Sequence, residues 1–304
     1  MICAEYARQG FDLTLRQLYY QFVSRDLLPN TQQSYNRLGA VVSDARMAGM
    51  LDWSYLVDRT RGISGGSGSW DDPVEYMTAA ADGYWIDLWQ GQPVHIEVWV
   101  EKEALAGVVA RAVRPFEAVH LSCRGYLSMS EAYVAGQRFT QHIAQGQRVL
   151  VLHLGDHDPS GLDMTRDNRD RLTRFITTNL AGRMPDDDDD MNNLLYEYGS
   201  DYEPAFTLRR IALNRDQIAR YNPPPNPAKM TDSRIGDYIA LHGRQSWELD
   251  ALPPQALMTL IREELTAAMD MSAFEARQAE QQTIRERMVA MVQANADMLT
   301  EGDG

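Results

Sequence analysis

The chain has 304 residues, 44% of them hydrophobic, and a formal net charge of −14 at pH 7. Its length allows two domains with separate cores, and its two cysteines exclude a disulfide framework and favour a reducing, cytoplasmic location. No apolar run approaches the roughly 18 residues that a membrane span needs, so we expect no membrane partner and no signal peptide. The acidic balance predicts only modest non-specific affinity for nucleic acid.

The first predicted element is a helix that begins at a capping box. Thr14 has the position of the N-cap and Gln17 that of the third helical residue, where each can cap the other. The helix should continue to about Leu28, because a proline follows it. Asn30 then predicts the N-cap of a second helix, which continues to about Gly49.

A winged helix-turn-helix domain over residues 1–65 is the interpretation that fits this start. The two helices are followed by a strand-like segment, residues 53–61. In such a domain the second helix enters the DNA groove, and here it carries Arg37 and Arg46. Residues 1–61 hold seven arginines against six acidic residues, so this end of an acidic chain is slightly basic.

Two adjacent tyrosines fall on different sides of the first helix. At about 100° per residue, Tyr19 lies within the apolar arc and should be a core residue, whereas Tyr20 lies roughly 120° from its centre. Arg16 precedes Tyr20 by one turn, and a cation there lowers the pKa of a phenol and can hold a phosphate. Tyr20 is therefore either a reactive residue or an ordinary half-exposed helix tyrosine.

The rest of the chain reads as an α/β domain with a Rossmann-like parallel sheet, followed by helices. The glycine- and serine-rich stretch 62–73 predicts a flexible connection, and we place the interdomain linker at residues 66–92. Apolar runs that alternate with helical patterns predict the sheet domain over residues 93–253. Residues 254–304 form a C-terminal helical segment whose apolar stripe suits packing or a dimer contact.

Acidic residues follow two of the predicted strands directly. Glu101 ends the first strand, and Asp156 and Asp158 end a later one. The carboxyl ends of parallel strands share one sheet edge, so these carboxylates should converge there, and Arg124 lies in a turn at the same edge. Carboxylates that close repel each other unless a cation lies between them. The pattern predicts a Mg²⁺ or Mn²⁺ site that handles phosphates.

Three other interpretations of the Asp-x-Asp pattern remain open. A calcium-binding helix-loop-helix would need a preceding helix and Glu at position 12, which is Asp167 here. A phosphatase of the haloacid dehalogenase type would use Asp156 as nucleophile, but it leaves Glu101 unexplained. The two acids could also be a solvated loop pair without chemistry.

The proline-rich stretch 221–229 should be extended, and it leads into further polar residues. Among them, Lys229 and Arg234 could contact the DNA backbone, although a plain structural loop fits equally well. Further on, Glu248 could add to the metal site.

The segments VEKEAL, at residues 100–105, and GDHDPSGLDM, at residues 155–164, resemble the Toprim domain of type IIB topoisomerase A subunits and meiotic double-strand-break proteins. The resemblance implies that Glu101, Asp156 and Asp158 are Mg²⁺ ligands, with Lys102 beside them. It also places the Cys-Arg-Gly sequence around Arg124 where the family often has Gly-Lys-Gly, so that Arg124 would contact phosphate. A cysteine in place of the first glycine departs from the family pattern.

Residues 16–20, RQLYY, resemble the same family, which has R-x-x-Y-Y or R-x-x-F-Y on this helix. This resemblance implies that Tyr20 attacks DNA and that Arg16 assists it. It further implies a homodimer in which the tyrosine of one subunit meets the Toprim domain of the other. Topoisomerase action in the family needs a separate ATPase B subunit, and the chain has no nucleotide-binding glycine loop of its own.

These observations predict a metal-dependent enzyme that cleaves double-stranded DNA by tyrosine transesterification and is associated with the nucleoid. Two alternatives remain. A Toprim nuclease would cut by metal-activated water and leave Tyr20 a structural role. A non-catalytic DNA-binding or assembly factor would bind DNA without cutting it.

Overall fold

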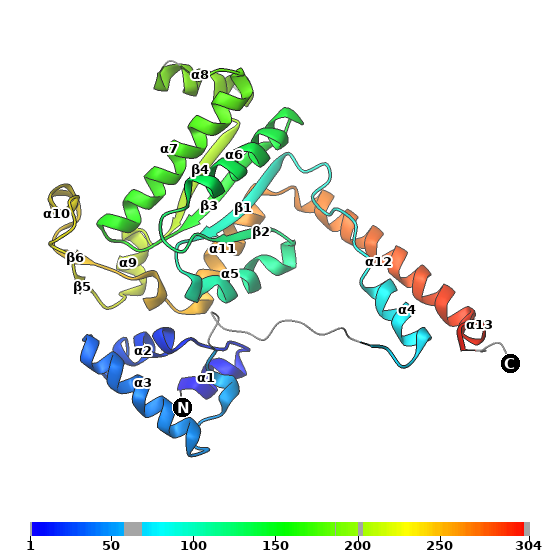
Figure 1. Ribbon diagram of the computed structural model, residues 1–304, viewed down its shortest axis with the longest axis horizontal. Helices are drawn as coiled ribbons and strands as arrows, with labels where there is room; N and C mark the ends of the chain where they lie inside the picture. The colour runs from blue at the N-terminus through cyan, green and yellow to red at the C-terminus, as the bar shows by residue number, and fades with distance from the viewer. Residues whose placement is uncertain (1, 58–68, 186, 200–202, 301–304) are drawn as a thin grey trace. The chain divides into compact units, whose positions relative to one another are not determined.

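The computed structural model describes residues 2–57, 69–185, 187–199 and 203–300 of a mixed α/β protein (Figure 1). The chain divides into two compact units. The first comprises Met1–Arg61 and Val94–Ala267, and the second comprises Gly62–Pro93 and Ala268–Gly304.

A four-stranded parallel sheet forms the centre of the first unit, with the strand order β2-β1-β3-β4. Its strands are β1 Val94–Val100, β2 Val119–Ser122, β3 Arg148–Leu154 and β4 Phe206–Ala212. The two central strands are buried almost throughout, as expected where helices cover both faces of a parallel sheet. The predicted α/β class with a parallel sheet is confirmed.

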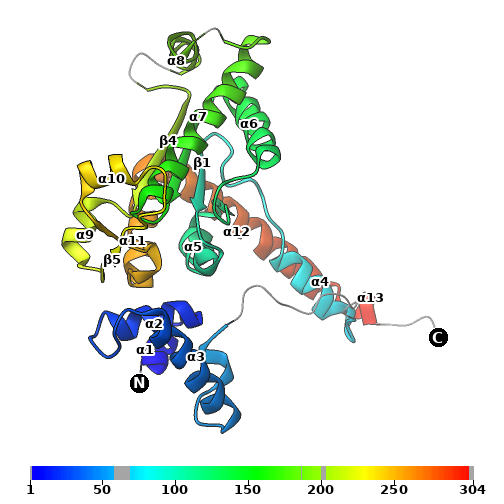
Figure 2. The ribbon, with the colours of Figure 1, turned by 60° about the vertical axis from the view of Figure 1, so that its left-hand side comes forward.

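Helices connect the strands and cover the sheet. The connecting helices are α5 Ala106–Val113, α6 Met129–Ala144, α7 Pro159–Ala181 and α8 Asp188–Glu197. Helices α6 and α7 lie side by side on one face (Figures 1 and 2), where Trp99, Phe139 and Leu172 form part of a buried apolar cluster. On the other face α5 contacts β1 and β2.

After β4 the chain forms short elements that return to the carboxyl edge of the sheet. They are α9 Arg215–Tyr221, β5 Asn226–Pro227, α10 Ile235–His242, β6 Gln245–Ser246, the 3₁₀ turn η4 Leu249–Ala251 and α11 Pro254–Ala268. Strands β5 and β6 form a small antiparallel pair, and Trp247 then pairs with His157 just beyond β3. This return places residues 247–251 beside the Asp-x-Asp loop.

The N-terminal part of the first unit consists of α1 Ile2–Arg8, α2 Leu15–Val23 and α3 Gln32–Met47. The predicted capping box is confirmed at the start of α2. The Thr14 side chain accepts a hydrogen bond from the Gln17 backbone N at 3.2 Å, and the Gln17 side chain accepts one from the Thr14 backbone N at 2.9 Å.

Two local expectations about the helices of this part are wrong. Helix α2 ends at Val23 and not near Leu28, and the chain then passes through a left-handed residue, Asp26, at φ 55°, which a helix cannot contain. The N-cap of α3 is Thr31 and not Asn30, whose side chain is hydrogen-bonded elsewhere.

The expected strand over residues 53–61 is replaced, within its described part, by the 3₁₀ turn η1 Trp53–Tyr55 and a single bridge between Leu13 and Leu56. Residues 58–61 lie outside the described residues.

The second unit is built from α4 Pro73–Asp82, α12 Met271–Ala294 and α13 Ala296–Thr300. Helix α4 packs against α12 and α13 although it lies within the predicted linker 66–92. The chain therefore divides at other places than the sequence predicted. The expected C-terminal segment 254–304 is also split, because most of α11 belongs to the first unit.

The hydrogen bonds within this second unit show why the linker prediction failed. Gln92 donates to the Asp270 carbonyl and accepts from the Asp270 backbone N, both at 2.8 Å, and Gln281 accepts from the Ile86 backbone N at 2.9 Å. A search of the described residues for a helix both long and apolar enough to cross a bilayer found none.

A buried carboxylate on β1 makes a prediction about acid stability. Glu97 is fully buried, and it accepts hydrogen bonds from Trp99 at 2.8 Å and Arg138 at 2.7 Å and contacts His95 at 3.2 Å. Burial alone would raise the pKa of Glu97, but the hydrogen bonds from His95 and Arg138 and the charge of Arg138 lower it to about 2. Ionised Glu97 therefore stabilises the fold above its unfolded-state pKa, and this contribution is lost as the pH falls toward 2.

We expect the stability difference between wild type and Glu97→Gln to shrink by roughly 3 kcal/mol from pH 6 to pH 2, at about 1.4 kcal/mol per pKa unit. Urea unfolding followed by tryptophan fluorescence measures it. A difference that stays constant over this range would contradict the burial of an ionised Glu97.

Candidate active site at the carboxyl edge of the sheet

The candidate site lies where β1 and β3 end side by side. The Glu101 backbone N donates to the Leu154 carbonyl at 2.9 Å, so the segments that follow the two strands start together. The chain of β1 continues into Lys102, and that of β3 continues into Asp156. The predicted convergence of these segments at one sheet edge is confirmed.

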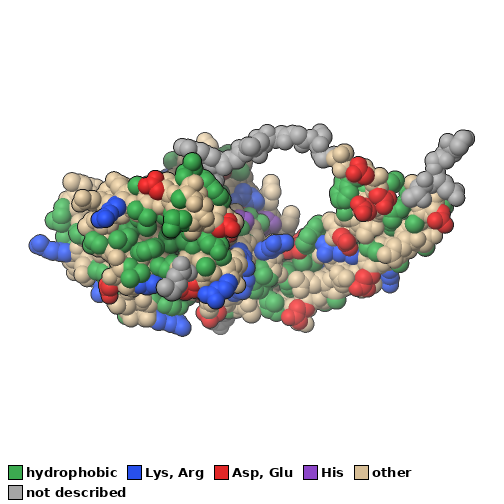
Figure 3. All heavy atoms as spheres, turned by 90° about the horizontal axis from the view of Figure 1, so that it is seen from below, with side chains coloured by type: hydrophobic (Ala, Val, Ile, Leu, Met, Phe, Trp, Pro, Cys, Tyr) green, Lys and Arg blue, Asp and Glu red, His purple; other side chains and the backbone are tan. Residues whose placement is uncertain are grey.

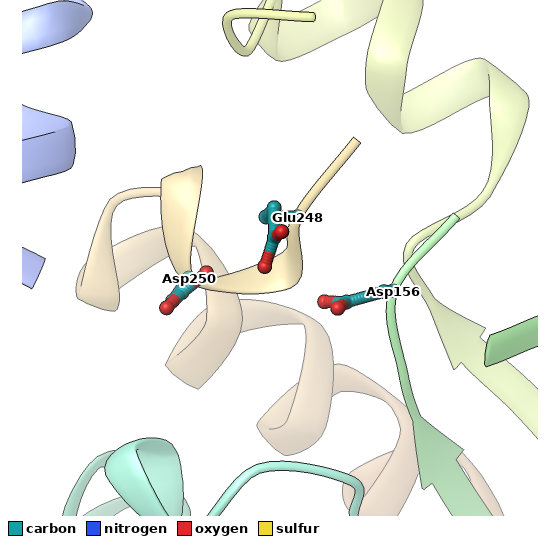
Figure 4. Close-up of side chains that lie close together, drawn as sticks. All are labelled: Asp156, Glu248 and Asp250. Atoms are coloured by element: carbon teal, nitrogen blue, oxygen red, sulfur yellow. The ribbon is translucent and has the colours of Figure 1, made fainter. Parts of the chain in front are cut away.

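Three carboxylates meet at this edge, and we call them the acid triad: Asp156, Glu248 and Asp250. Their ligand oxygens lie within 4.8 Å of one another, and Figure 4 shows the side chains turned toward a common space. Asp156 follows β3, whereas Glu248 and Asp250 come from the segment at η4. The Leu249 backbone N donates to Asp156 Oδ1 at 2.8 Å and so ties this segment to the loop.

Two cations of the same chain contact the acid triad. Lys102 Nζ lies 2.8 Å from Asp156 Oδ2 and 3.1 Å from Asp250 Oδ1, and it also forms an ion pair with Glu248. Arg16, from α2, lies 2.6 Å from Glu248 Oε2 and 2.8 Å from Asp250 Oδ2. Three acids thus face two cations.

The pKa values reflect this imbalance. Burial raises the pKa of Asp156 to about 8, and the neighbouring acids oppose the lowering effect of Lys102. Burial works against the charge of Lys102, but the three acids raise its pKa above the ordinary value. Glu248 is half-buried, yet Lys102 and Arg16 hold its pKa below the usual range. A protonated Asp156 would leave two carboxylates facing two cations, which is a neutral site.

The other two predicted metal ligands, Glu101 and Asp158, bond the backbone of the same loop. Glu101 Oε2 accepts a hydrogen bond from the Asp156 backbone N at 2.9 Å, and burial raises the pKa of Glu101. Asp158 is the N-cap of α7 and accepts from the Gly161 backbone N at 2.6 Å. Of the predicted ligand set, the acid triad therefore includes only Asp156. Glu248 had been considered as an addition, and Asp250 was missed.

A spacing signal for the missed residue exists in the sequence. Glu248 and Asp250 are acids at i and i+2, the same spacing as Asp156 and Asp158. That signal becomes informative only when residues 247–251 are known to return to the end of β3.

Arg210 on β4 holds the Asp-x-Asp loop in place, and no sequence signal singled it out. Its guanidinium donates to the carbonyls of Gly155 at 2.7 Å and Asp156 at 2.5 Å, and to Thr165 Oγ1 at 2.7 Å. The loop also requires Gly161, because a Cβ there would lie 2.3 Å from the Asp156 carbonyl oxygen. Arg210 thus holds the loop through its backbone carbonyls, and Glu101 holds it through the backbone N–H of Asp156.

Tyr20 is more buried than its helical phase predicts. It is 5% exposed and Tyr19 is 4% exposed, so both are core residues of α2. Burial and the charges of Glu248 and Asp250 raise the pKa of Tyr20 to about 12. Arg16 lowers it, as predicted, but its guanidinium is 5.9 Å from the ring centroid and the other influences dominate.

Tyr20 nevertheless lines a pocket of about 240 Å³ within the first unit. The lining also includes Arg16, Asn30, Asn226 and Glu248. Side chains from α2 and from the segment just before η4 therefore line the same pocket.

The residues predicted to contact phosphate or DNA differ in their exposure and in the partners that they already have. Arg37 and Lys229 are exposed, and the side chain of Arg124 is 74% exposed and pairs with Glu103 at 3.0 Å. Residue 124 has a left-handed backbone, φ 56°, and the neighbouring Cys123 side chain is buried in the core. The cysteine that departs from the family pattern therefore points away from the surface.

Arg46 and Arg234 have structural partners that were not foreseen. Arg46 donates to the carbonyls of Trp53, at 2.9 Å, and Leu56. Arg234 lies 2.5 Å from Asp163 and 2.8 Å from Asp232. Their predicted role in DNA binding would require these contacts to be shared or broken.

The surface of the N-terminal helices carries charges of both signs among exposed hydrophobic side chains. The left-hand part of Figure 3 shows hydrophobic side chains over much of this face, with separate basic and acidic side chains among them. The exposed hydrophobic residues near α3 are Val41, Met47, Met50 and Trp53. Cations that stand apart in this way can each contact a separate phosphate, but they form no single basic patch on this face. Comparisons of the chain with protein-family models, curated proteins and solved structures found no match.

Proposed function

We propose that this protein is a metal-dependent DNA-cleaving enzyme with winged-helix and Toprim domains, similar to a type IIB topoisomerase A subunit. In this proposal Tyr20 attacks a phosphate of double-stranded DNA. The observation that carries the proposal is the pocket shared by Tyr20 and Glu248, with Arg16 in contact with both the acid triad and the tyrosine ring.

The fold supports the Toprim interpretation in its general features. The sheet is parallel, its central strands β1 and β3 end in acidic segments, and helices cover both faces. Ligands of open α/β sheets bind at this carboxyl edge. The three N-terminal helices are compatible with a helix-turn-helix domain, whereas a wing strand is absent from the described residues up to position 57.

The acid triad fits Mg²⁺ or Mn²⁺. Carboxylate oxygens are the ligands that these ions prefer, and three of them lie within 4.8 Å of one another. Asp250 Oδ2 is buried and pairs with the Arg16 guanidinium at 2.8 Å, so a metal ion bound there would take the place of a cation that the site already attracts. Asp156, Glu248 and Asp250 would hold the ion, with Glu101 and Asp158 as further predicted ligands. When bound, the ion would neutralise charge on the scissile phosphate.

Each reacting group of the chain has a defined task in this reaction. The Tyr20 oxygen forms a bond to phosphorus and passes its proton to water, while the bond from phosphorus to the deoxyribose oxygen breaks and that oxygen leaves with the electron pair and takes up a proton from water. Arg16 and Arg124 hold the phosphate oxygens. Lys102 keeps the carboxylates of the acid triad together. The pKa of about 12 for Tyr20 means that the phenol must lose its proton during the attack.

The resemblance suggests the setting in which this reaction would take place. The proposal includes a homodimer on double-stranded DNA in the nucleoid, and strand passage would depend on a separate ATPase B subunit. Without such a partner the protein would break DNA only.

Incubation with supercoiled plasmid and Mg²⁺ or Mn²⁺, stopped with detergent, tests the proposal. We expect nicked or linear DNA that carries covalently bound protein, so that its mobility changes after protease treatment. The product should disappear with chelator and with Asp156→Asn, because an amide cannot supply the ionised oxygen that a metal ion would bind. Cleaved DNA with free ends would instead support hydrolysis.

Hydrolysis by metal-activated water is a second candidate function that one observation favours. Tyr20 is 5% exposed and its pKa is raised, and both properties suit a structural residue better than a nucleophile. A protein that binds DNA but does not cut it with either metal would be a non-catalytic factor.

A further inference from the structure

We infer that Tyr20 works with the acid triad of its own chain, so that a single chain carries a complete cleavage site. The inference rests on the proposed function and specifies how its site is assembled. It departs from the arrangement that the family resemblance implies, in which the tyrosine of one subunit meets the acids of the other.

Arg16 is the first link between the two halves of the site. It lies one helical turn before Tyr20 on α2, and its guanidinium contacts Glu248 at 2.6 Å and Asp250 at 2.8 Å. The Asp250 side chain is fully buried, so this ion pair is partly shielded from water. An ion pair of this kind fixes the start of α2 beside the acids more firmly than an exposed pair would.

A second link lies on the other side of the pocket and does not involve any charge. Asn30, between α2 and α3, donates from Nδ2 to Asn226 Oδ1 on β5 at 2.5 Å. Asn226 also lines the same pocket as Tyr20, and its side-chain amide lowers the pKa of the phenol. The N-terminal helices are therefore tied to the 226–250 region at two separate points.

The 226–250 region is in turn fastened to the sheet. The backbones of His157 and Trp247 exchange hydrogen bonds of 2.8 and 3.0 Å, and β5 pairs with β6 directly before Trp247. The segment that carries Asn226 is thus hydrogen-bonded, within one chain, to the loop that carries Asp156.

The pocket between these links has the chemistry that a phosphodiester needs. It holds about 240 Å³ and is lined by polar side chains, including the amides Asn30 and Asn226 and the cation Arg16. Arg16 can offer a forked pair of N–H donors to phosphate oxygens when phosphate replaces a carboxylate partner. Tyr20 and Glu248 line the same pocket, so a phosphate bound there would lie beside the nucleophile and the acid triad.

A cysteine pair tests the placement without any activity measurement. The double variant Asn30→Cys/Asn226→Cys should form a disulfide on mild oxidation, because the two native side chains are in contact; the native cysteines Cys3 and Cys123 are buried. We expect a product with monomer mobility on a non-reducing denaturing gel. The matched control Arg37→Cys/Asn226→Cys places one thiol further along α3 and should remain reduced. A disulfide-linked dimer, or no disulfide in the test pair, would overturn the inference.

Mixed subunits test the same inference during cleavage. Tyr20→Phe and Asp156→Asn chains with different tags are produced together, and species that carry both tags are isolated. If the site is built within one chain, neither chain has a complete site, and plasmid cleavage should fall at least 100-fold below wild type. Cleavage near half the wild-type level would show that the site is shared between chains. Recovery of active wild type only as a monomer would support the inference.

The two experiments separate the inference from the proposed function. A wild-type protein that never cleaves DNA rejects the proposed function, while the cysteine pair still decides which chain contributes the N-terminal helices. A cleaving wild type with an interchain disulfide rejects the inference alone.

Discussion

Tyr20→Phe is expected to abolish DNA cleavage, lowering the rate by at least about 10³-fold, because only the phenol oxygen can form the bond to phosphorus. The substitution removes one oxygen and keeps the aromatic ring. It should cost about 1 kcal/mol of stability, because it removes a polar group from a buried side chain and leaves the polar neighbours of the phenol without it. The Kd for DNA, measured by fluorescence anisotropy, should stay within about twofold of wild type, because no phosphate contact is removed. A twofold change in Kd corresponds to about 0.4 kcal/mol.

Tyr19→Phe is the matched control for this prediction. Tyr19 is the preceding residue, is buried to the same degree, and its hydroxyl accepts from the Thr31 backbone N at 2.8 Å and donates to the Thr31 carbonyl at 3.0 Å. Its loss should cost about 1–2 kcal/mol of stability and leave cleavage in place. If Tyr20→Phe cuts at the wild-type rate and leaves free ends, the nucleophile is water and Tyr20 has a structural role.

The parallel sheet could be predicted because its strands carry their signal locally. The buried strands β1 and β3 are continuous apolar runs, and each ends in acidic residues that cannot continue such a run. The N-cap at Thr14 is equally local, since a capping box needs only four residues. In contrast, the sequence predicts a linker where α4 lies, because the neighbouring residues are glycine- and serine-rich and the packing partner α12 lies about 190 residues further on.

The candidate site depends on contacts between distant segments, and these limited the prediction. Asp156 was identified, because its strand predicts the sheet edge at which it lies. Glu248 and Asp250 join it through the pairing of Trp247 with His157, which short polar segments do not reveal in a sequence. Arg210 acts on backbone carbonyls, and no spacing rule connects an arginine in a strand with a loop 50 residues earlier. The burial of Tyr20 likewise results from contacts outside its own helix.

Lys102→Met should be the most destabilising substitution at this edge of the sheet, with a loss of about 3–5 kcal/mol in the absence of divalent ions. Lys102 contacts all three members of the acid triad, and its side chain is only 16% exposed. Methionine keeps most of the side-chain volume, so the loss arises from uncompensated charge. Arg16 alone would then face three acids that are close enough to raise each other's pKa.

Divalent ions should reverse this loss if the acid triad is a metal site. Removal of the competing ammonium group leaves three oxygen ligands together, and an ion at about 100 times its Kd would restore about 2.7 kcal/mol. Urea unfolding with and without Mg²⁺ or Mn²⁺ measures both effects, and Lys229→Met is the matched control, because the chain's other lysine is exposed. That control should change by less than about 0.5 kcal/mol in either condition. A Lys102→Met protein that is destabilised but indifferent to both ions would indicate that the acid triad is a charge cluster satisfied by Lys102, and would remove the metal from the proposed reaction.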